Sequence, residues 1–254
     1  MDWRRAKSVL IFAFLMLNII LGYQLWTEWR ERLNTVVNWT SLPPETLQFM
    51  RENNIIVDDN AKIPTETPAM RDLTYSIKHL AGNRILDQKP INPSPESRIV
   101  FEEELIKSLG GVIPELSSYK LDQLGSREGV FFAFNRMEGE WPIFDIHLKL
   151  FYSERKIKTY TQDIIEINSS TTNKDQQVLP AAKALAKVIE TNLPAGSVVK
   201  EIRLGYHGEI FEDAETQVSK PSWRVLLENG EEVYYVNAFS AEVTTEKGDA
   251  LVNQ

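Results

Sequence analysis

The sequence predicts an α+β protein: a single N-terminal transmembrane helix, then an extracytoplasmic module of two units, each a helix plus an antiparallel meander. Three observations lead to this prediction. Residues 8–26 form an apolar run without a charged side chain. Helical patterns at 98–111 and 178–196 are each followed by three runs that read as strands. Short turns join these runs, and the helices are too few to connect parallel strands, which favours α+β over a doubly wound fold.

The apolar run reads as an uncleaved membrane anchor. At about 1.5 Å per helical residue, it comes close to the roughly 30 Å hydrocarbon core of a bilayer. It has no small-x-small cleavage site, and the chain has no cysteine, which a lipoprotein signal would need. Tyr23 and Trp26 fit the interfacial aromatic belt at its far end. The alternative is a buried core helix of a soluble protein, which the length and the basic flank argue against.

Basic residues before the run predict its orientation. Arg4, Arg5 and Lys7 precede it, whereas the flank after it carries charges of both signs. Because positively charged flanks stay in the cytoplasm, we expect a single-pass protein of the cell membrane with a cytoplasmic N-terminus. The chain after about residue 28 would then be extracytoplasmic.

One asparagine, Asn18, lies in the middle of the apolar run. An amide inside a membrane needs a partner, and interhelical hydrogen bonds of this type contribute roughly 0.6–2 kcal/mol. We therefore expect a surface that contacts a partner helix, formed by Phe14, Asn18, Leu21, Tyr23 and Trp26. The alternative is that Asn18 bonds its own helix backbone or a water molecule.

The patterns divide the chain into three segments. Residues 1–30 hold the cytoplasmic N-terminus and the transmembrane helix, 31–172 a juxtamembrane segment and the first α+β unit, and 173–254 the second unit. The clearest strand lies at 141–155, because apolar and polar residues alternate there. Asn229-Gly230 is the strongest hairpin signal.

Composition and motifs exclude several classes of function. The formal net charge is -8 and basic residues do not cluster beyond the N-terminus, so we expect no nucleic-acid partner. Without cysteine there are no zinc fingers, iron–sulfur sites or thiol nucleophiles. Residues 117–120 have S-x-x-K spacing but lack the S-D-N and K-T-G motifs that accompany it in penicillin-binding enzymes.

The histidines and two tryptophans are the remaining candidates for a site. His79, His147 and His207 have no ligand partner at i+2 or i+4, so we expect exposed sheet histidines and no metal. Trp141 and Trp223 each have two readings, a binding anchor or a core cap, and for Trp223 the apolar neighbours Val225 and Leu227 on the same strand face favour the core. The sequence thus predicts a non-enzymatic protein without catalytic residues, cofactor or metal.

Three stretches resemble the YycI family of Gram-positive Firmicutes. MDWRRAKSVLIFAFLMLNIILGYQLW is similar to the family's N-terminus, with its MDW-basic pattern and apolar run. EWPIFDIHLKLFYSERKIKTYTQ resembles its middle region through residues 142–145 and through Ile157, Tyr160 and Gln162. PSWRVLLENGEEVYYVNAFSAEV resembles its closing hairpin and, more loosely, that of PepSY-type modules, which usually carry a glycine in place of Ser240-Ala241.

The resemblance implies an accessory regulator that acts with a sister membrane protein, YycH, on the sensor histidine kinase WalK of the WalKR cell-wall two-component system. It also implies contacts among transmembrane helices, a hetero-oligomer, and paired α+β units outside the membrane. Two alternatives remain. One is an anchored cell-wall hydrolase using scattered residues such as His147 with Glu138 or Asp145. The other is a sensor module that binds a wall fragment or a peptide between the two units.

Overall fold

The computed structural model describes residues 14–16, 18, 21, 42–79, 84–85, 98–127, 130–153, 156–168, 174–211, 213–228, 230 and 232–247. The chain splits into two compact units, Met1–Ser41 and Leu42–Gln254. The first unit contains the predicted transmembrane helix, and the second contains the helices and strands of the predicted outer module.

In the first unit the described residues are helical and expose their side chains. Phe14, Leu15, Met16 and Leu21 are each at least 52% exposed, and Asn18 is exposed as well. Within the described part of the chain, no helix combines the length and the apolar composition that crossing a bilayer requires. The other residues of the predicted helix contact and orientation lie outside the described residues: Arg4, Arg5, Lys7, Tyr23 and Trp26.

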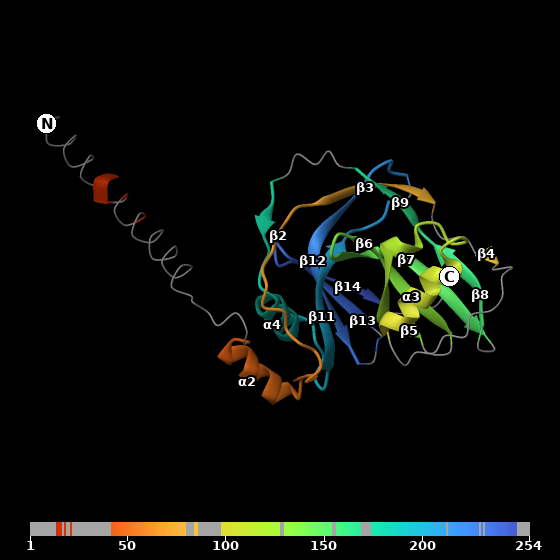
Figure 1. Cartoon of the computed structure of the whole chain (residues 1–254). Helices are drawn as coiled ribbons and strands as arrows, with labels where there is room; N and C mark the ends of the chain where they lie inside the picture. Colours follow the sequence, from red (N-terminus) through yellow and green to blue (C-terminus); the bar gives the residue numbers. More distant parts are fainter. Residues whose placement is uncertain are drawn as a thin grey trace, which may run out of the picture. The chain divides into compact units, whose positions relative to one another are not determined.

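The second unit is an α+β structure built around a mixed sheet, as the sequence predicts (Figure 1). Among the described residues, 12 strands belong to this sheet. Its neighbours are antiparallel along the main path, except at one junction where β11 and β7 run parallel. The main path is β14 (Val243–Lys247), β13 (Glu232–Asn237), β12 (Gln217–Leu227), β11 (Val198–His207), β7 (Trp141–Ser153), β6 (Phe131–Glu138) and β5 (Tyr119–Arg127).

Shorter strands extend the sheet on both sides of this path. β1 (Ile56–Val57) pairs with β11 in parallel, and β3 (Leu73–His79) lies between β12 and β9 (Ile164–Ile167). β8 (Lys156–Gln162) pairs with β7 and with β4 (Arg84–Ile85). A separate two-stranded sheet consists of β2 (Ala69–Met70) and β10 (Gln176–Gln177).

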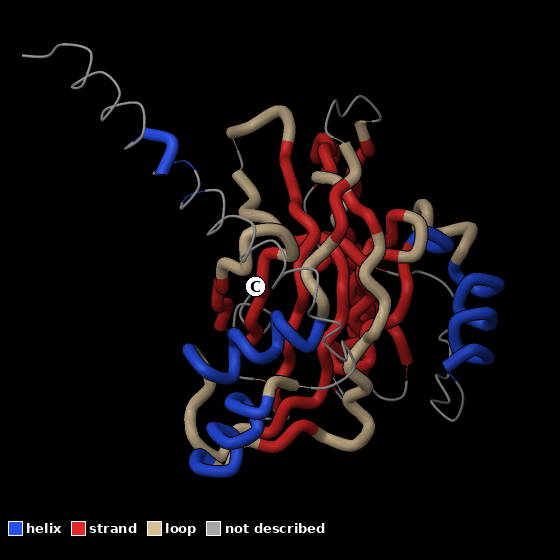
Figure 2. Tube along the Cα trace, turned by 90° about the vertical axis from the view of Figure 1, so that its left-hand side faces the viewer, coloured by secondary structure: helices blue, strands red, loops and turns tan. Residues whose placement is uncertain are grey.

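The helices cover the sheet in two places. α2 (Pro44–Asn53) and α4 (Ala181–Thr191) pack together, and α4 also contacts β11, β12 and β13. α3 (Arg98–Leu109) contacts β5 and the short 3-10 helix η1 (Leu116–Ser118). Figure 2 shows α3 apart from the other two helices, across the strands. The pair α2 and α4 covers one hydrophobic core cluster, and α3 covers another.

The periodicities predicted from the sequence explain this burial. In α4 the predicted inward positions Leu185 and Ile189 are fully buried. In β7 the predicted alternation is also present, because Leu148 and Leu150 are fully buried while Lys149 between them is partly exposed. These elements were predicted correctly since their apolar residues recur with the period of a helix or a strand.

Three strand predictions in the meanders differ from the structure. Residues 156–169 were expected as one strand, but they form β8 and β9, which pair with β7 and with β3 respectively. Residues 231–245 were expected as one strand, but they form β13 and β14, joined by a turn after Asn237. The Asn237 side-chain oxygen accepts hydrogen bonds from the backbone N–H groups of Phe239 and Ser240, which stabilises this turn. β5 was not predicted, because Gly125 and Ser126 interrupt its apolar pattern.

The strands of the two predicted units belong to one sheet. β11 and β12 come from the second predicted unit, 173–254, yet β11 pairs with β7 and with β1 of the first. Residues 42–254 accordingly form a single compact unit. The predicted boundary between the two α+β units, at 172/173, stays a prediction.

Candidate functional site

The parallel junction of β7 and β11 brings strands of the two predicted α+β units into contact. Its register pairs Tyr206 with Ile143. At Gly205 an added Cβ would lie 2.5 Å from the carbonyl oxygen of Pro142 and 2.6 Å from the Phe144 ring. Only a residue without a side chain allows this approach, so Gly205 sets how closely the strands meet.

A bulge in β7 turns its side chains toward this junction. Asn135 of β6 lies opposite His147, whereas the next residue, Arg136, lies opposite Ile143. Residues 144–146 therefore have no partner on β6. Bulges commonly re-aim a side chain in this way, and here the bulge presents Asp145 to β11.

Asp145 and His207 form a hydrogen-bonded pair across the junction. His207 Nδ1 donates to Asp145 Oδ1 at 2.7 Å, and the Gly208 N–H donates to Asp145 Oδ2 at 2.8 Å. The His207 ring stacks on Tyr235, with centroids 3.7 Å apart and planes inclined by 10°. Glu246 of β14 approaches His207 Nε2 to 4.0 Å. The cluster thus ties together β7, β11, β13 and β14.

The surroundings of His207 favour its protonated form. Burial by itself would lower the pKa of His207, but the hydrogen bond and charge of Asp145, with the charge of Glu246, outweigh it. The net effect is a raised pKa. His207 is therefore more readily charged than an isolated histidine, which strengthens its attraction to both carboxylates.

Asp145, His207 and Glu246 also form a group of residue types that could ligate a metal. One potential ligand atom from each lies within 4.8 Å of the others. However, both oxygens of Asp145 already accept hydrogen bonds, one from His207 and one from Gly208. The arrangement can hold and share a proton, and a metal would have to displace existing contacts.

A second polar cluster is buried between β5 and β12. Arg224 of β12 and Asp122 of β5 are only 5% and 3% exposed. Arg224 Nη2 donates to Asp122 Oδ1 at 3.1 Å and to Glu201 Oε1 at 2.7 Å, and Nη1 donates to Asp122 Oδ2. The guanidinium carbon lies 4.6 Å from the centroid of the Phe144 ring. The cluster joins β5 to β12 although three strands separate them in the sheet.

The charges in this buried cluster compensate one another. Burial raises the pKa of Asp122, but the charge and hydrogen bonds of Arg224 act more strongly, with help from Asn135, and hold it well below its usual range. Asn135 Nδ2 donates to Asp122 Oδ2 at 3.0 Å. The network is a structural device, since each of its charges already has a partner inside the protein.

The structure assigns the three histidines different roles. His79 is exposed, as predicted. The expectation of exposure was wrong for His147 and His207, which are partly buried. Burial lowers the pKa of His147, and its backbone N–H donates to Asp163 Oδ2 at 2.9 Å. Asp145, suggested as a partner of His147 in the hydrolase alternative, instead hydrogen-bonds His207.

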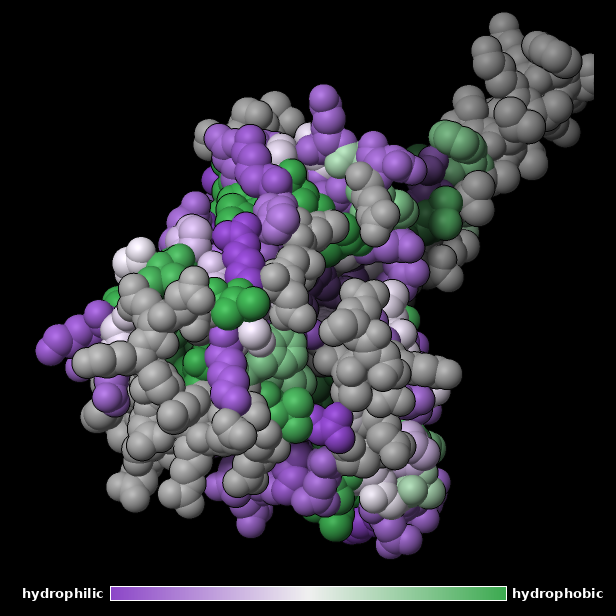
Figure 3. Space-filling model, turned by 90° about the vertical axis from the view of Figure 1, so that its right-hand side faces the viewer, coloured by the Kyte–Doolittle hydropathy of each residue, from purple (hydrophilic) through white to green (hydrophobic). Residues whose placement is uncertain are grey.

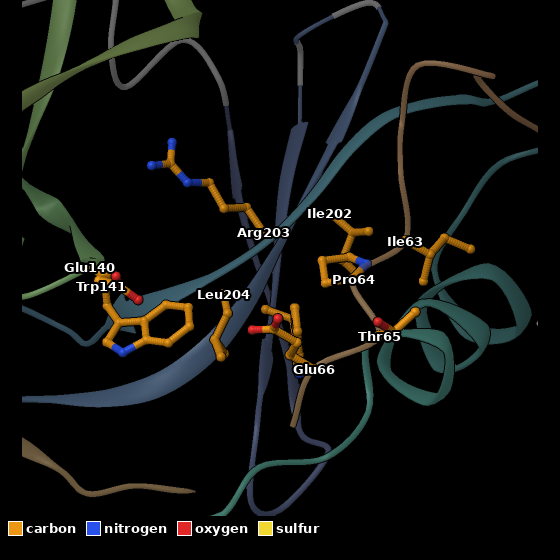
Figure 4. Close-up of a pocket in the computed structure, with 10 residues that line it drawn as sticks. Ile63, Pro64, Thr65, Glu66, Glu140, Trp141, Ile202, Arg203 and Leu204 are labelled. Atoms are coloured by element: carbon orange, nitrogen blue, oxygen red, sulfur yellow. The ribbon is translucent and has the colours of Figure 1, made fainter. Parts of the chain in front are cut away.

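A cavity opens beside the same junction. It has a volume of about 420 Å³ and lies between the segment 63–66, the turn that joins β6 to β7, and the strands β11 and β12 (Figure 4). Trp223 contributes to it but is 1% exposed, and its Nε1 donates to the Leu179 carbonyl oxygen at 2.7 Å, which confirms the core reading. Trp141 is partly exposed in the cavity wall.

Comparison with known protein families decides the classification. A family model described as YycI protein matches residues 103–239, more than half of the chain. The chain belongs to the YycI family. This is a family of regulatory accessory proteins of two-component systems. A search of curated proteins gave no match.

The YycI match covers the residues that build the junction. It runs from α3 to the turn after β13 and includes the bulge of β7, Gly205, His207 and Arg224. Residues 142–145, which carried part of the resemblance in the sequence, form the start of β7 and its bulge. Sequence reasoning had singled out this stretch without finding its partner His207, which is 62 positions away.

Proposed function

We propose that this chain is a membrane-anchored accessory regulator of a WalK-type sensor histidine kinase, acting together with a YycH-type membrane protein. In this proposal its N-terminus lies in the cytoplasm and its second unit outside the membrane. The family match over residues 103–239 carries the proposal. The charge-free run at 8–26 and the basic residues before it support membrane anchoring.

The regulator would act by favouring one of two signalling arrangements of the kinase. Such a bias can be no larger than the difference in contact free energy between the two arrangements. We expect the contacts to come from the transmembrane helix and from the outer surface. Hydrophobic side chains on that surface are available for this purpose, including Ile85 at 77% and Phe211 at 56% exposure. On the face drawn in Figure 3, hydrophobic residues form patches among hydrophilic ones.

Deletion of the gene tests this function. We expect changed transcription of autolysin-type genes, restored by the wild-type chain supplied in trans. Crosslinking in membranes followed by purification of the full chain should recover a sensor kinase and a second single-pass protein. An unchanged set of transcripts together with recovery of neither partner would contradict the proposal.

A further inference from the structure

The cavity beside the junction has the size and the composition of a small-molecule site. Its volume of about 420 Å³ lies within the range of roughly 300–1,000 Å³ that is usual for ligand pockets. Ile202 and Leu204 of β11 form an apolar floor, and Ile63 and Pro64 form one wall. Figure 4 shows Trp141 on the opposite side, at the start of β7.

The polar groups at the cavity opening are mainly negative. Glu66 and Glu140 both line it and both are exposed. Among the residues that the structure describes, neither carboxylate takes part in an ion pair. In Figure 4 the Glu66 carboxylate points to the side of the cavity where Leu204 and Trp141 lie, whereas the Arg203 guanidinium extends away from Glu66.

We propose that this cavity binds a small ligand that carries a primary ammonium group, such as a diamino acid or a short peptide containing one. An ammonium ion over the face of an indole is attracted by the ring, and tryptophan is the strongest aromatic partner. The carboxylates of Glu66 and Glu140 would complete the site by pairing with the same charge. The acidic net charge of the chain, -8, further raises the local concentration of cations.

The site would join two separate parts of the chain. Residues 63–66 lie in a segment without helix or strand, and Trp141 follows the β6–β7 turn. A ligand held between them would therefore couple the N-terminal segment of the second unit to the β7–β11 junction. This inference stands apart from the identity of the kinase, since it concerns the cavity alone.

Calorimetric titration of the full chain in detergent micelles tests the inference. The probes are Nα-acetyl-lysine methylamide, free lysine and a lysine-containing tetrapeptide, which separate an amino-acid source from a peptide source. We expect saturable binding of at least one, with dissociation constants up to roughly 10 mM. The same probes acetylated on the side-chain nitrogen should not bind, because acetylation removes the charge.

Variants then assign the binding to the cavity. Glu66→Gln and Trp141→Leu should each weaken binding about tenfold, and Trp141→Phe should weaken it less. Glu209→Gln, an exposed glutamate outside the cavity lining, is the matched control and should leave affinity unchanged. Circular dichroism identifies any variant that fails to fold. Three results would overturn the proposal. They are equal binding of the acetylated probes, undiminished binding by both Glu66→Gln and Trp141→Leu, and no binding of any amine.

Discussion

Arg224 is a charged side chain that the fold buries almost completely, and its partners explain how this is possible. Its guanidinium donates to Asp122 and Glu201 and lies over the Phe144 ring. Buried ion pairs gain little over apolar residues of the same size, but breaking one leaves an uncompensated charge. The network therefore favours a sheet shape in which β5 and β12 approach each other, because Asp122 could not otherwise reach Arg224.

Removing the arginine alone should be severely destabilising. We expect Arg224→Leu to lower the free energy of unfolding by about 3–5 kcal/mol, because Asp122 then stays buried without a partner. The double variant Arg224→Leu/Asp122→Leu should recover part of this loss. Urea denaturation of the full chain measures both. As a control, Lys78→Ala breaks an exposed ion pair with Glu166 and should cost less than about 1 kcal/mol. A similar loss of unfolding free energy in Arg224→Leu and Lys78→Ala would show that breaking the buried network costs no more than breaking an exposed ion pair.

The His207 cluster should make stability depend on pH. A histidine whose pKa is raised by folding stabilises the protein fully below its unfolded value, about 6.5, and this stabilisation is lost as pH rises through the folded value. His147, with a lowered pKa, acts in the opposite sense, so the two must be separated.

Comparing variants separates them. We expect the stability difference between wild type and His207→Gln to be larger at pH 6 than at pH 8, because the stabilisation by protonated His207 is lost as pH rises. The contribution of His147 is the same in both proteins and cancels in the difference. Thermal unfolding across this range provides the measurement. The exposed His79→Gln serves as the control. If the wild-type and His207→Gln curves run parallel between pH 6 and pH 8, the raised pKa of His207 is wrong.

At this scale the sequence predicted little of the site. Burial of Trp223 was predicted from its neighbours on the same strand face, and those neighbours are local. Pairing of Asp145 with His207, and of Asp122 with Arg224, involves residues 62 and 102 positions apart. Such contacts depend on which strands lie side by side and in which register, and alternation within one strand carries no information on either.

At the scale of elements, local periodicity was sufficient to predict α3, α4 and most strands, but it did not predict which elements lie side by side. The hairpin of β12 and β13 was expected from Asn229-Gly230, and Gly230 indeed has a φ of 63°. The parallel pairing of β7 with β11 leaves no such signal, because parallel neighbours need no turn between them. Gly205 is required for this pairing, but the requirement can be recognised only once the opposing strand β7 is known.

A methyl group at Gly205 should therefore disturb the junction. We expect Gly205→Ala to lower the free energy of unfolding by about 1–3 kcal/mol, since the added Cβ would collide with the Pro142 backbone and the Phe144 ring. Gly111→Ala is the matched control, because an added Cβ there meets no described atom within 4 Å. Denaturant titration of both variants gives the comparison. Equal stability of the two would mean that β7 and β11 can separate without cost.

On the scale of the whole molecule, the chain combines an apolar N-terminal segment with one compact α+β unit, Leu42–Gln254. The α+β class was predicted correctly, and strands from both predicted units form one sheet through the β7–β11 junction. The described residues of the N-terminal segment are helical and expose apolar side chains such as Phe14 and Leu21. Exposed apolar surface of this kind is favourable only when lipid or another protein covers it.

Asn18 offers a direct test of whether a partner helix covers that surface. If its amide hydrogen-bonds across helices, Asn18→Leu should reduce the association constant roughly threefold to thirtyfold, the equivalent of about 0.6–2 kcal/mol. The measurement is recovery of the crosslinked complex from membranes, with circular dichroism to verify that the second unit stays folded. Asn18→Gln keeps an amide and should retain most of the recovery. Were Asn18→Leu recovered as well as wild type, the asparagine would bond its own helix or water, and regulation would have to pass through the outer surface instead.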